Sequence, residues 1–485
     1  MLSKAKRSVP LPNYKVRDPG FPDNPKDTRG HGEDVLLDMA VKEATRRAKF
    51  YVQNVQTFKL SVSYEELEED TRSLTDLELL CDNLQQKAPI PMSTRIVDKN
   101  GLPLLNILAS RRHNTLLNKP PVLPIDEIFD EFHSQTALDQ AKAEGAKIFH
   151  DGFSDEVIEH YHKSVQTLAH FMPPVPEKTQ SRHRNLPDAY LNDGQTEIVN
   201  TENETFAVRD GYAYKRTEEG PPGKKVINYV LNAMEIFQED KNGNRVRRFE
   251  LCGVRHPVQA WIQQAKPQQG LYVGSDLTQS GETLVGYASY LKDTKHVSVI
   301  FATYFKILYP REYKLLKKVF DAGQWLMDEG TPFLGRAIVY KLPLKLHKDT
   351  KDFSITGTFP SGSYEGGGII YPQLDAIFRY APGDICFSIA VTLYHKLAAW
   401  TPTIMNLHDP TTPGRVGTVF FCPAETVKQL EGKKPGEGVL THYGRNSYKD
   451  GSLPRKRAVD GEPELGEYKK KAKKNRRSRS RKNKN

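Results

Sequence analysis

The amino-acid sequence predicts an α+β protein. We expect a double-stranded β-helix (jelly-roll) core, an appended helical N-terminal region and a disordered basic C-terminal tail. Three observations support this fold class. Residues 333–421 are short apolar runs separated by turn residues, which is typical of a small β-barrel. Helical spacing dominates residues 31–172, and the end of the chain is basic without any hydrophobic pattern.

The N-terminal region is expected to be helical after a disordered start. Residues 1–30 are rich in Pro, Lys and Asp and have no periodicity, so we expect disorder there. Apolar positions at helical spacing follow in residues 34–52. Ser63 and Glu66 have the spacing of a capping box, which predicts a helix from there to about Gln86. Two further amphipathic helices are expected, at residues 125–146 and 154–171.

A proline-rich stretch from Pro173 to Pro187 is the best candidate for a domain boundary. We therefore place a linker at residues 173–204, the core at 205–424 and the disordered tail at 425–485. Within the core, Asn242-Gly243 predicts the turn of a hairpin. Its strands would include residues 235–237 and 248–251, and helices are expected at 257–264 and 311–327. Six strands are expected, at residues 337–346, 353–359, 368–371, 377–380, 385–393 and 416–421.

A candidate metal site begins at the end of the first of these six strands. His347 and Asp349 are two residues apart, and alternate residues of a strand face the same side, so both can bind one ion. His395 follows a later strand and would complete the set. Two imidazoles and one carboxylate form a facial triad, which leaves three adjacent positions of Fe(II) open for a cosubstrate and O₂. No catalytic residue is expected beyond this metal site.

Two alternatives compete with this interpretation. An isolated His-x-Asp pattern more often belongs to surface residues, but here a Pro-Gly-Asp turn ending at Asp384 and an apolar strand precede His395. That context is what a jelly-roll needs to bring its last ligand inward. His408 is the other candidate for the third ligand. It lies in a loop rich in Pro and Asp, where a surface position is more natural.

Arg415 precedes the last apolar strand and is expected to bind a carboxylate of 2-oxoglutarate. The planar guanidinium of arginine can donate two parallel hydrogen bonds to such a group. The alternative is that the side chain extends to solvent. The order His347, Asp349, His395, Arg415 is that of an Fe(II)/2-oxoglutarate-dependent dioxygenase.

The net charge of +10 comes from the end of the chain, where eleven basic and no acidic residues lie between Lys469 and Lys484. Without them the remaining net charge is −1. Such a tail predicts a nuclear localisation signal, an arm for the phosphate backbone of DNA, or both; a merely solvated terminus is the alternative. No apolar run reaches the ~18 residues of a membrane span. The four cysteines form no Cys-x-x-Cys pair, so neither a zinc module nor a disulfide framework is expected.

From His347 to Phe421 the sequence resembles the TET/JBP family of nucleic-acid-base dioxygenases, in the compact form found in fungi. In that family an Asn or Asp three residues after the His-x-Asp motif contacts the flipped base, and Asp352 matches it. An aromatic residue six positions after the cosubstrate arginine stacks on the base, and Phe421 stands there. The family often has a hydroxyl residue two positions after that arginine. Here Gly417 occupies this position and Thr418 is adjacent, so Thr418 is the expected second cosubstrate contact.

The resemblance implies oxidation of the methyl group of 5-methylcytosine in DNA, with Fe(II), 2-oxoglutarate and O₂. A methyl group inside a duplex cannot reach a metal, so the base must be flipped. Asp352 suits cytosine, because a carboxylate accepts a hydrogen bond from its exocyclic amine. A nuclear protein without membrane contact is expected, with a monomer favoured. Two alternatives remain: a dioxygenase of the same fold acting on protein side chains or small molecules, and a non-catalytic nucleic-acid-binding protein.

Overall fold

In a computed structural model of the protein, the described residues are 2–4, 33–110, 151–175, 186–187, 197–199, 205–209, 212–219, 226–239, 242–262, 270–326, 329–403 and 414–435. The chain divides into two compact units, Met1–Val439 and Leu440–Asn485, and all described residues belong to the first. Several expectations lie outside the described residues. They are the helix at 125–146, the loop with His408, and the basic tail from Lys469.

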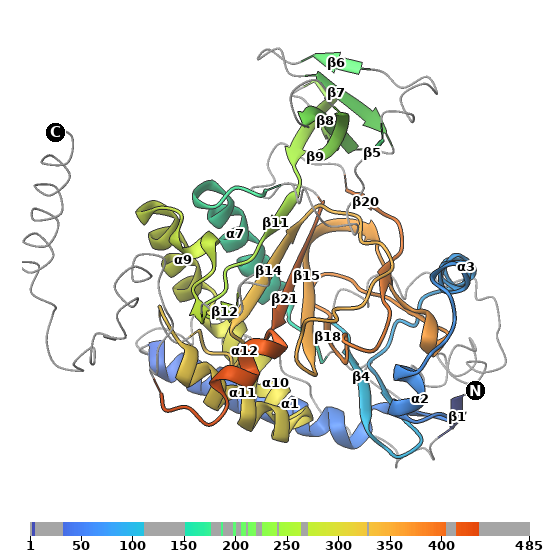
Figure 1. The fold of residues 1–485 in the computed structure, drawn as a ribbon, viewed down its shortest axis with the longest axis vertical. Coiled ribbons are helices and arrows are strands. Elements are labelled where there is room, and N and C mark those ends of the chain that lie inside the picture. The colour runs from blue at the N-terminus through green and yellow to red at the C-terminus, as the bar shows by residue number, and fades with distance from the viewer. Residues whose placement is uncertain are drawn as a thin grey trace, which may run out of the picture. The chain divides into compact units, whose positions relative to one another are not determined.

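The main sheet has ten strands (Figure 1). They are β1 (Leu2–Lys4), β2 (Gln56–Leu60), β3 (Thr94–Val97), β4 (Pro103–Leu108), β11 (Gly253–Arg255), β14 (Gly335–Tyr340), β15 (Thr356–Gly366), β18 (Ile385–Ser388), β20 (Trp400–Pro402) and β21 (Gly414–Phe421). Their order is β1-β2-β3-β4-β18-β15-β21-β14-β11, and β20 pairs with the end of β15. All pairings are antiparallel except that of β2 with β3.

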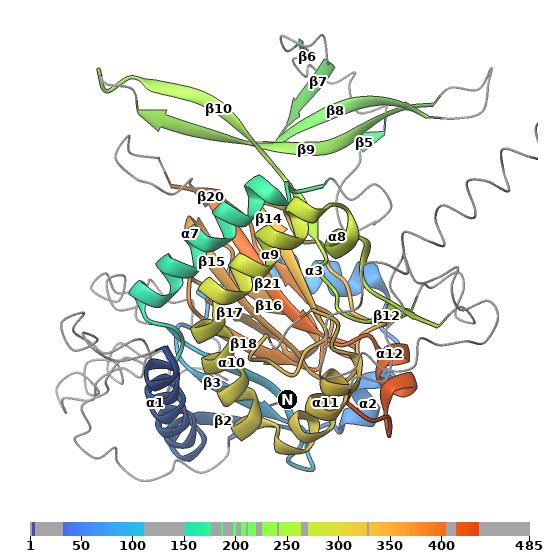
Figure 2. The same ribbon diagram turned by 90° about the vertical axis from the view of Figure 1, so that its left-hand side faces the viewer.

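Three smaller sheets accompany it. One has the order β17 (Ala376–Phe378), β16 (Ile369–Tyr371) and β19 (Lys396–Leu397). A two-stranded sheet pairs β12 (Trp261–Ile262) with β13 (Leu271–Tyr272). The third contains β5 (Leu186–Pro187), β6 (Glu197–Val199), β7 (Thr205–Arg209), β8 (Tyr212–Glu219), β9 (Val226–Glu239) and β10 (Arg245–Leu251). It projects from one end of the main sheet, above β14 and β20 in Figure 2.

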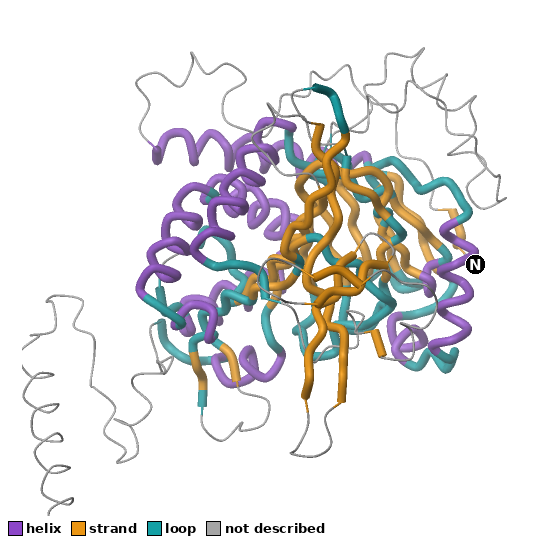
Figure 3. Tube along the Cα trace, turned by 90° about the horizontal axis from the view of Figure 1, so that it is seen from above, coloured by secondary structure: helices purple, strands orange, loops and turns teal. Residues whose placement is uncertain are grey.

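The helices are α1 (Glu33–Asn54), α2 (Tyr64–Glu68), α3 (Leu74–Gln85), α7 (Asp155–Phe171), α8 (Ser275–Thr278), α9 (Gly281–Asp293), α10 (Lys295–Leu308), α11 (Pro310–Gly323) and α12 (Ala424–Leu430), with a 3₁₀ turn η4 at Pro372–Leu374. Most of them gather on one side of the strands (Figure 3). No helix among the described residues combines the length and apolar character that a membrane span requires.

The two faces of the main sheet have different neighbours. On one face, Phe301 of α10 packs against Phe359, Phe387 and Phe420, with ring centroids 4.6–5.9 Å apart. All four rings are fully buried, and burying each stabilises the fold by about 1.5–3 kcal/mol. Because side chains alternate along a strand, Arg415 lies on the face opposite to Phe420. Helix α10 therefore covers one face and leaves the opposite face for the candidate site.

Several expected elements are confirmed. Helix α1 covers residues 34–52, Ser63 forms the capping box that opens α2, and Ser154 caps α7. The hairpin is present as β9 and β10, with Phe249 opposite Glu235. A mixture of helices and strands in several sheets is therefore confirmed.

Other expectations are corrected. The helix expected to run from Ser63 to Gln86 is two helices, because a second capping box at Ser73 restarts the chain. Residues 31–172 are not only helical, since β2, β3 and β4 belong to the main sheet. Where a helix was expected at residues 257–264, Trp261 and Ile262 pair as a strand. Order also reaches into both ranges expected to be disordered, as β1 near the start and as α12 after residue 424.

Candidate metal centre

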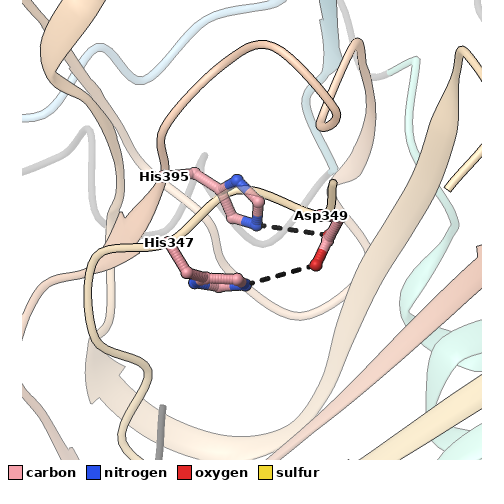
Figure 4. Close-up of side chains that lie close together, drawn as sticks. All are labelled: His347, Asp349 and His395. Atoms are coloured by element: carbon pink, nitrogen blue, oxygen red, sulfur yellow. Dashed lines mark ion pairs between the residues drawn. The ribbon is translucent and has the colours of Figure 1, made fainter. Parts of the chain in front are cut away.

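His347, Asp349 and His395 come together with one ligand atom each within 4.8 Å of the others. The two Nε2 atoms face the same carboxylate, at 3.6 Å from Oδ1 for His347 and 3.6 Å from Oδ2 for His395 (Figure 4). The three side chains are between 10% and 15% exposed, so the site is enclosed and still accessible. Two nitrogens and one oxygen on one side of a small space are the donors that a facial triad supplies to Fe(II).

Backbone pairing fixes this arrangement. His347 and His395 form an isolated antiparallel bridge, in which each backbone N–H donates to the carbonyl of the other at 3.1 and 2.9 Å. The imidazole centroids are consequently 4.2 Å apart. The backbone N–H of Asp349 donates to the carbonyl of Ala390 at 2.9 Å. The two histidines are therefore anchored to each other through the main chain, and Asp349 is anchored to Ala390, five residues before His395.

The other ring nitrogen of each histidine contacts a backbone carbonyl. Nδ1 of His347 lies 2.8 Å from the oxygen of Lys345, and Nδ1 of His395 lies 3.2 Å from that of Leu393. A carbonyl can only accept, so Nδ1 carries the proton and the Nε2 lone pair is directed at the centre. This is the arrangement that metal-binding histidines need. The residues therefore fit a divalent metal ion.

Arg415 is 5% exposed, and its Nε is buried without a hydrogen-bond partner. No described residue forms an ion pair with it. Its guanidinium carbon lies 5.2 Å from the ring centre of Tyr380 and 5.9 Å from that of Tyr364, so aromatic faces surround the charge. The unpaired Nε carries a free-energy cost that these aromatic faces offset in part. The site therefore fits an anionic ligand that supplies the missing partner.

A row of polar and aromatic groups connects Arg415 with the metal centre. The hydroxyl groups of Tyr380 and Thr358 form a short hydrogen bond, and Cys386 lies directly opposite Thr358 on the neighbouring strand. The sulfur of Cys386 is 3.2 Å from the hydroxyl of Tyr371. The ring of Tyr371 in turn lies 6.1 Å from that of His395.

This row places the arginine and the triad on the same side of the main sheet. Burial raises the pKa of the Cys386 thiol to about 12, so it stays neutral beside the site. Tyr364, Tyr371 and Tyr380 were not expected to contribute to the site. The sequence offered one signal for two of them. Tyr364 shortly precedes the Gly366-Gly367-Gly368 run, and Tyr380 shortly precedes the Pro382-Gly383-Asp384 turn.

Thr418 is not brought together with Arg415. It lies on the helix-covered face of β21, where its hydroxyl is 2.7 Å from that of Tyr161 in α7. The threonine is fully buried there. Alternation along the strand separates positions 415 and 418, because they differ by an odd number of residues.

Asp352 and Phe421 both lie near the end of β21. Asp352 forms an isolated bridge with Pro423, and its backbone N–H donates to the carbonyl of Asp349 at 2.9 Å. Its carboxylate accepts a hydrogen bond from the hydroxyl of Thr356 at 3.2 Å. Phe421 is 9% exposed, and its ring packs on the backbone of Gly335, where an added Cβ would come within 2.8 Å of the ring.

No protein-family profile and no curated protein sequence matches the chain. Among solved structures, it is similar to NgTET1 in complex with 5mC DNA, with 13% identity and a TM-score of 0.36 over 81% of this chain and 100% of that one. It is also similar to C-terminally truncated NcT7HdeltaC of Neurospora crassa in apo form, with 9% identity and a TM-score of 0.22 over 76% and 94%. The full-length Neurospora crassa protein in complex with alpha-KG gives 9% identity and a TM-score of 0.19 over 78% and 95%.

Proposed function

We propose that the protein is an Fe(II)/2-oxoglutarate-dependent dioxygenase that oxidises the methyl group of 5-methylcytosine in DNA. The observation that carries the proposal is the pairing of two sites on one face of the sheet. One is an enclosed triad of His347, Asp349 and His395. The other is Arg415, a buried cation whose Nε has no hydrogen-bond partner and which forms no ion pair with any residue that the structure describes. A dicarboxylate that chelates a metal at one end and needs a cationic partner at the other matches both.

Bound Fe(II), with 2-oxoglutarate and O₂, supplies an oxidation in which 2-oxoglutarate becomes succinate and CO₂ and one oxygen atom enters the substrate. The protein orients the ligands and encloses the site. Carbonyls of Lys345 and Leu393 hold the two imidazoles in the tautomer that binds metal. Arg415, with Tyr364 and Tyr380 around it, would hold the distal carboxylate away from water.

We propose a double-stranded β-helix for the strands around the triad. The central strands β18, β15, β21 and β14 form the larger sheet, and β17, β16 and β19 form the smaller one. His395 directly precedes β19 in the smaller sheet, and His347 follows β14 of the larger sheet in the chain. The backbone bridge between these two histidines therefore connects the segment after β14 with the smaller sheet. A metal at the mouth of such a barrel is a common use of this architecture.

For the substrate, the support comes from Asp352, Phe421 and the basic tail. Asp352 follows the ligand Asp349 within one turn, and Phe421 ends the strand that starts with Arg415. A carboxylate near the metal suits the exocyclic amine of a flipped cytosine, and an aromatic ring suits its face. The tail would bind the phosphate backbone and direct the protein to the nucleus.

The test is mass spectrometry of nucleosides after the protein has been incubated with methylated DNA, Fe(II) and 2-oxoglutarate. The proposal expects hydroxymethylcytosine or further oxidised cytosines, with succinate formed alongside. His347→Ala is the matched control and should give none. Succinate without any oxidised base would retain the dioxygenase and refute the DNA substrate, in favour of a protein side chain or small molecule.

A further inference from the structure

The turn that precedes His395 forms side-chain hydrogen bonds with the N-terminal helix α2. Thr392 is 3% exposed, and its hydroxyl donates to the hydroxyl of Tyr64 at 3.1 Å and lies 3.4 Å from a carboxylate oxygen of Glu68. Tyr64 in turn donates to Glu68 at 2.5 Å. Two side chains of one short helix therefore hold the hydroxyl three residues before the metal ligand.

A second contact holds the same turn from the other side of Leu393. The backbone N–H of Tyr394 donates to the side-chain oxygen of Gln373 at 2.5 Å. The amide nitrogen of Gln373 lies 3.4 Å from the carbonyl of Leu67, which is again a residue of α2. Gln373 thus bridges α2 and the residue immediately before His395.

Helix α3 adds an electrostatic contact directly after the ligand. Lys396 forms ion pairs with Glu78 at 2.8 Å and with Asp82 at 3.3 Å. Its side chain is 18% exposed, less than either partner. Positions 392, 394 and 396 are therefore all tied to α2 or α3.

Between these ties lies the carbonyl of Leu393, which fixes the ring of His395 through Nδ1. The same turn presents the carbonyl of Ala390 to the backbone of Asp349. We infer that α2 and α3 are positioning elements of the metal centre, and that Tyr64, Glu68 and Thr392 set the orientation of His395. The inference rests on the proposed metal site and assigns this role to the N-terminal region.

The expected size of the effect follows from the position of these groups. Partners that orient a ligating imidazole typically change metal affinity by about 10–100-fold when removed. Thr392 acts one residue away from such a partner, so an effect near the lower end, roughly tenfold, is expected. Tyr64→Phe and Thr392→Val remove the two ends of one hydrogen bond. Their effects should therefore not add in the double variant.

The experiment measures binding of Fe(II) under anaerobic conditions and the absorption spectrum of Co(II) bound in its place, on the full chain. Thr392→Val and Tyr64→Phe should each weaken Fe(II) binding by roughly tenfold and alter the Co(II) spectrum. The double variant should resemble either single one. Thr303→Val and Tyr340→Phe are matched controls, because each removes one buried hydroxyl that bonds a backbone carbonyl on the helix-covered side. They should bind both metals as the unaltered protein does.

Wild-type affinity and an unchanged Co(II) spectrum in both test variants would overturn the inference while leaving the metal site in place. If the unaltered protein and His347→Ala bound Fe(II) equally weakly, the proposed metal site itself would be wrong. Thermal unfolding without metal separates positioning from folding. If a variant without metal has a lower unfolding temperature than the unaltered protein, Glu68→Gln is tested in its place. This substitution keeps the size of the side chain and removes the charge that accepts hydrogen bonds from Tyr64 and Thr392.

Discussion

Replacing Arg415 by methionine should abolish tight binding of 2-oxoglutarate without weakening the free protein. Methionine keeps much of the buried volume and removes the charge. In the free protein the unpaired Nε costs about 1–3 kcal/mol, while the two tyrosine faces return about 0.5–1 kcal/mol each. These terms offset each other to a large extent. We therefore expect the free energy of unfolding of the free protein to change by no more than about 2 kcal/mol.

The ligand-bound protein should respond differently. Hydrogen bonds to charged groups contribute about 1.5–3 kcal/mol, so the Kd for 2-oxoglutarate should rise about 10- to 150-fold. At a concentration of 100 times the original Kd, the ligand stabilises the unaltered protein by about 2.7 kcal/mol. The same concentration should stabilise the Arg415→Met variant by only about 0.3–1.4 kcal/mol.

The assay is calorimetric titration of 2-oxoglutarate with Mn(II) in place of Fe(II), together with denaturant unfolding with and without the ligand. Arg255→Met is the control, because Arg255 is similarly buried at 6% exposure but pairs with Asp276 at 3.0 Å. It should lower stability by about 3–5 kcal/mol and leave the Kd unchanged. An unchanged Kd in Arg415→Met would refute the assignment of this arginine to the cosubstrate.

Three further outcomes are expected. His347→Ala, Asp349→Ala and His395→Ala should each abolish 2-oxoglutarate turnover and Fe(II) binding while circular dichroism stays unchanged, since each removes one of three protein ligands. Asp352→Ala should depress oxidation of methylcytosine far more than decarboxylation of 2-oxoglutarate without substrate, because it is not a metal ligand; equal base oxidation would instead favour a non-DNA substrate. Deletion from Tyr468 onward should weaken DNA binding and flatten its dependence on salt, measured by fluorescence anisotropy at several salt concentrations, and an identical salt slope would show that the tail does not contact DNA.

The clustering of the three candidate metal ligands could be predicted from sequence because their positions follow local rules. His347 and Asp349 share a face through their spacing, and His395 follows a turn and a strand that identify it. The end of β14 was harder to predict. The strand ends at Tyr340, where Lys341 adopts a positive φ of 55° and donates its backbone N–H to the carbonyl of Arg415. Neither feature has a signal in the sequence.

The contribution of the N-terminal region escaped prediction for a related reason. Strand β4 pairs with β18, so that Ile385 lies opposite Leu108, and α2 contacts the turn before His395. Such contacts join residues hundreds of positions apart, and hydrophobic periodicity reports only local structure. Thr418 was wrongly assigned for a different reason. It is close to Arg415 in sequence, but alternation along β21 directs the two side chains to opposite faces.

The backbone bridge between His347 and His395 has a consequence for when the proposed metal ion could bind during folding. The two imidazoles become neighbours only when a strand end and a much later turn have paired, and that turn follows β18, the partner of β4. Contacts of this sequence separation close late and slowly during folding, because the entropy of loop closure must be overcome first. The proposed metal ion would therefore not template the early chain as zinc does in small finger domains. The protein without metal should fold first, and metal binding should appear as a separate kinetic phase that begins after refolding.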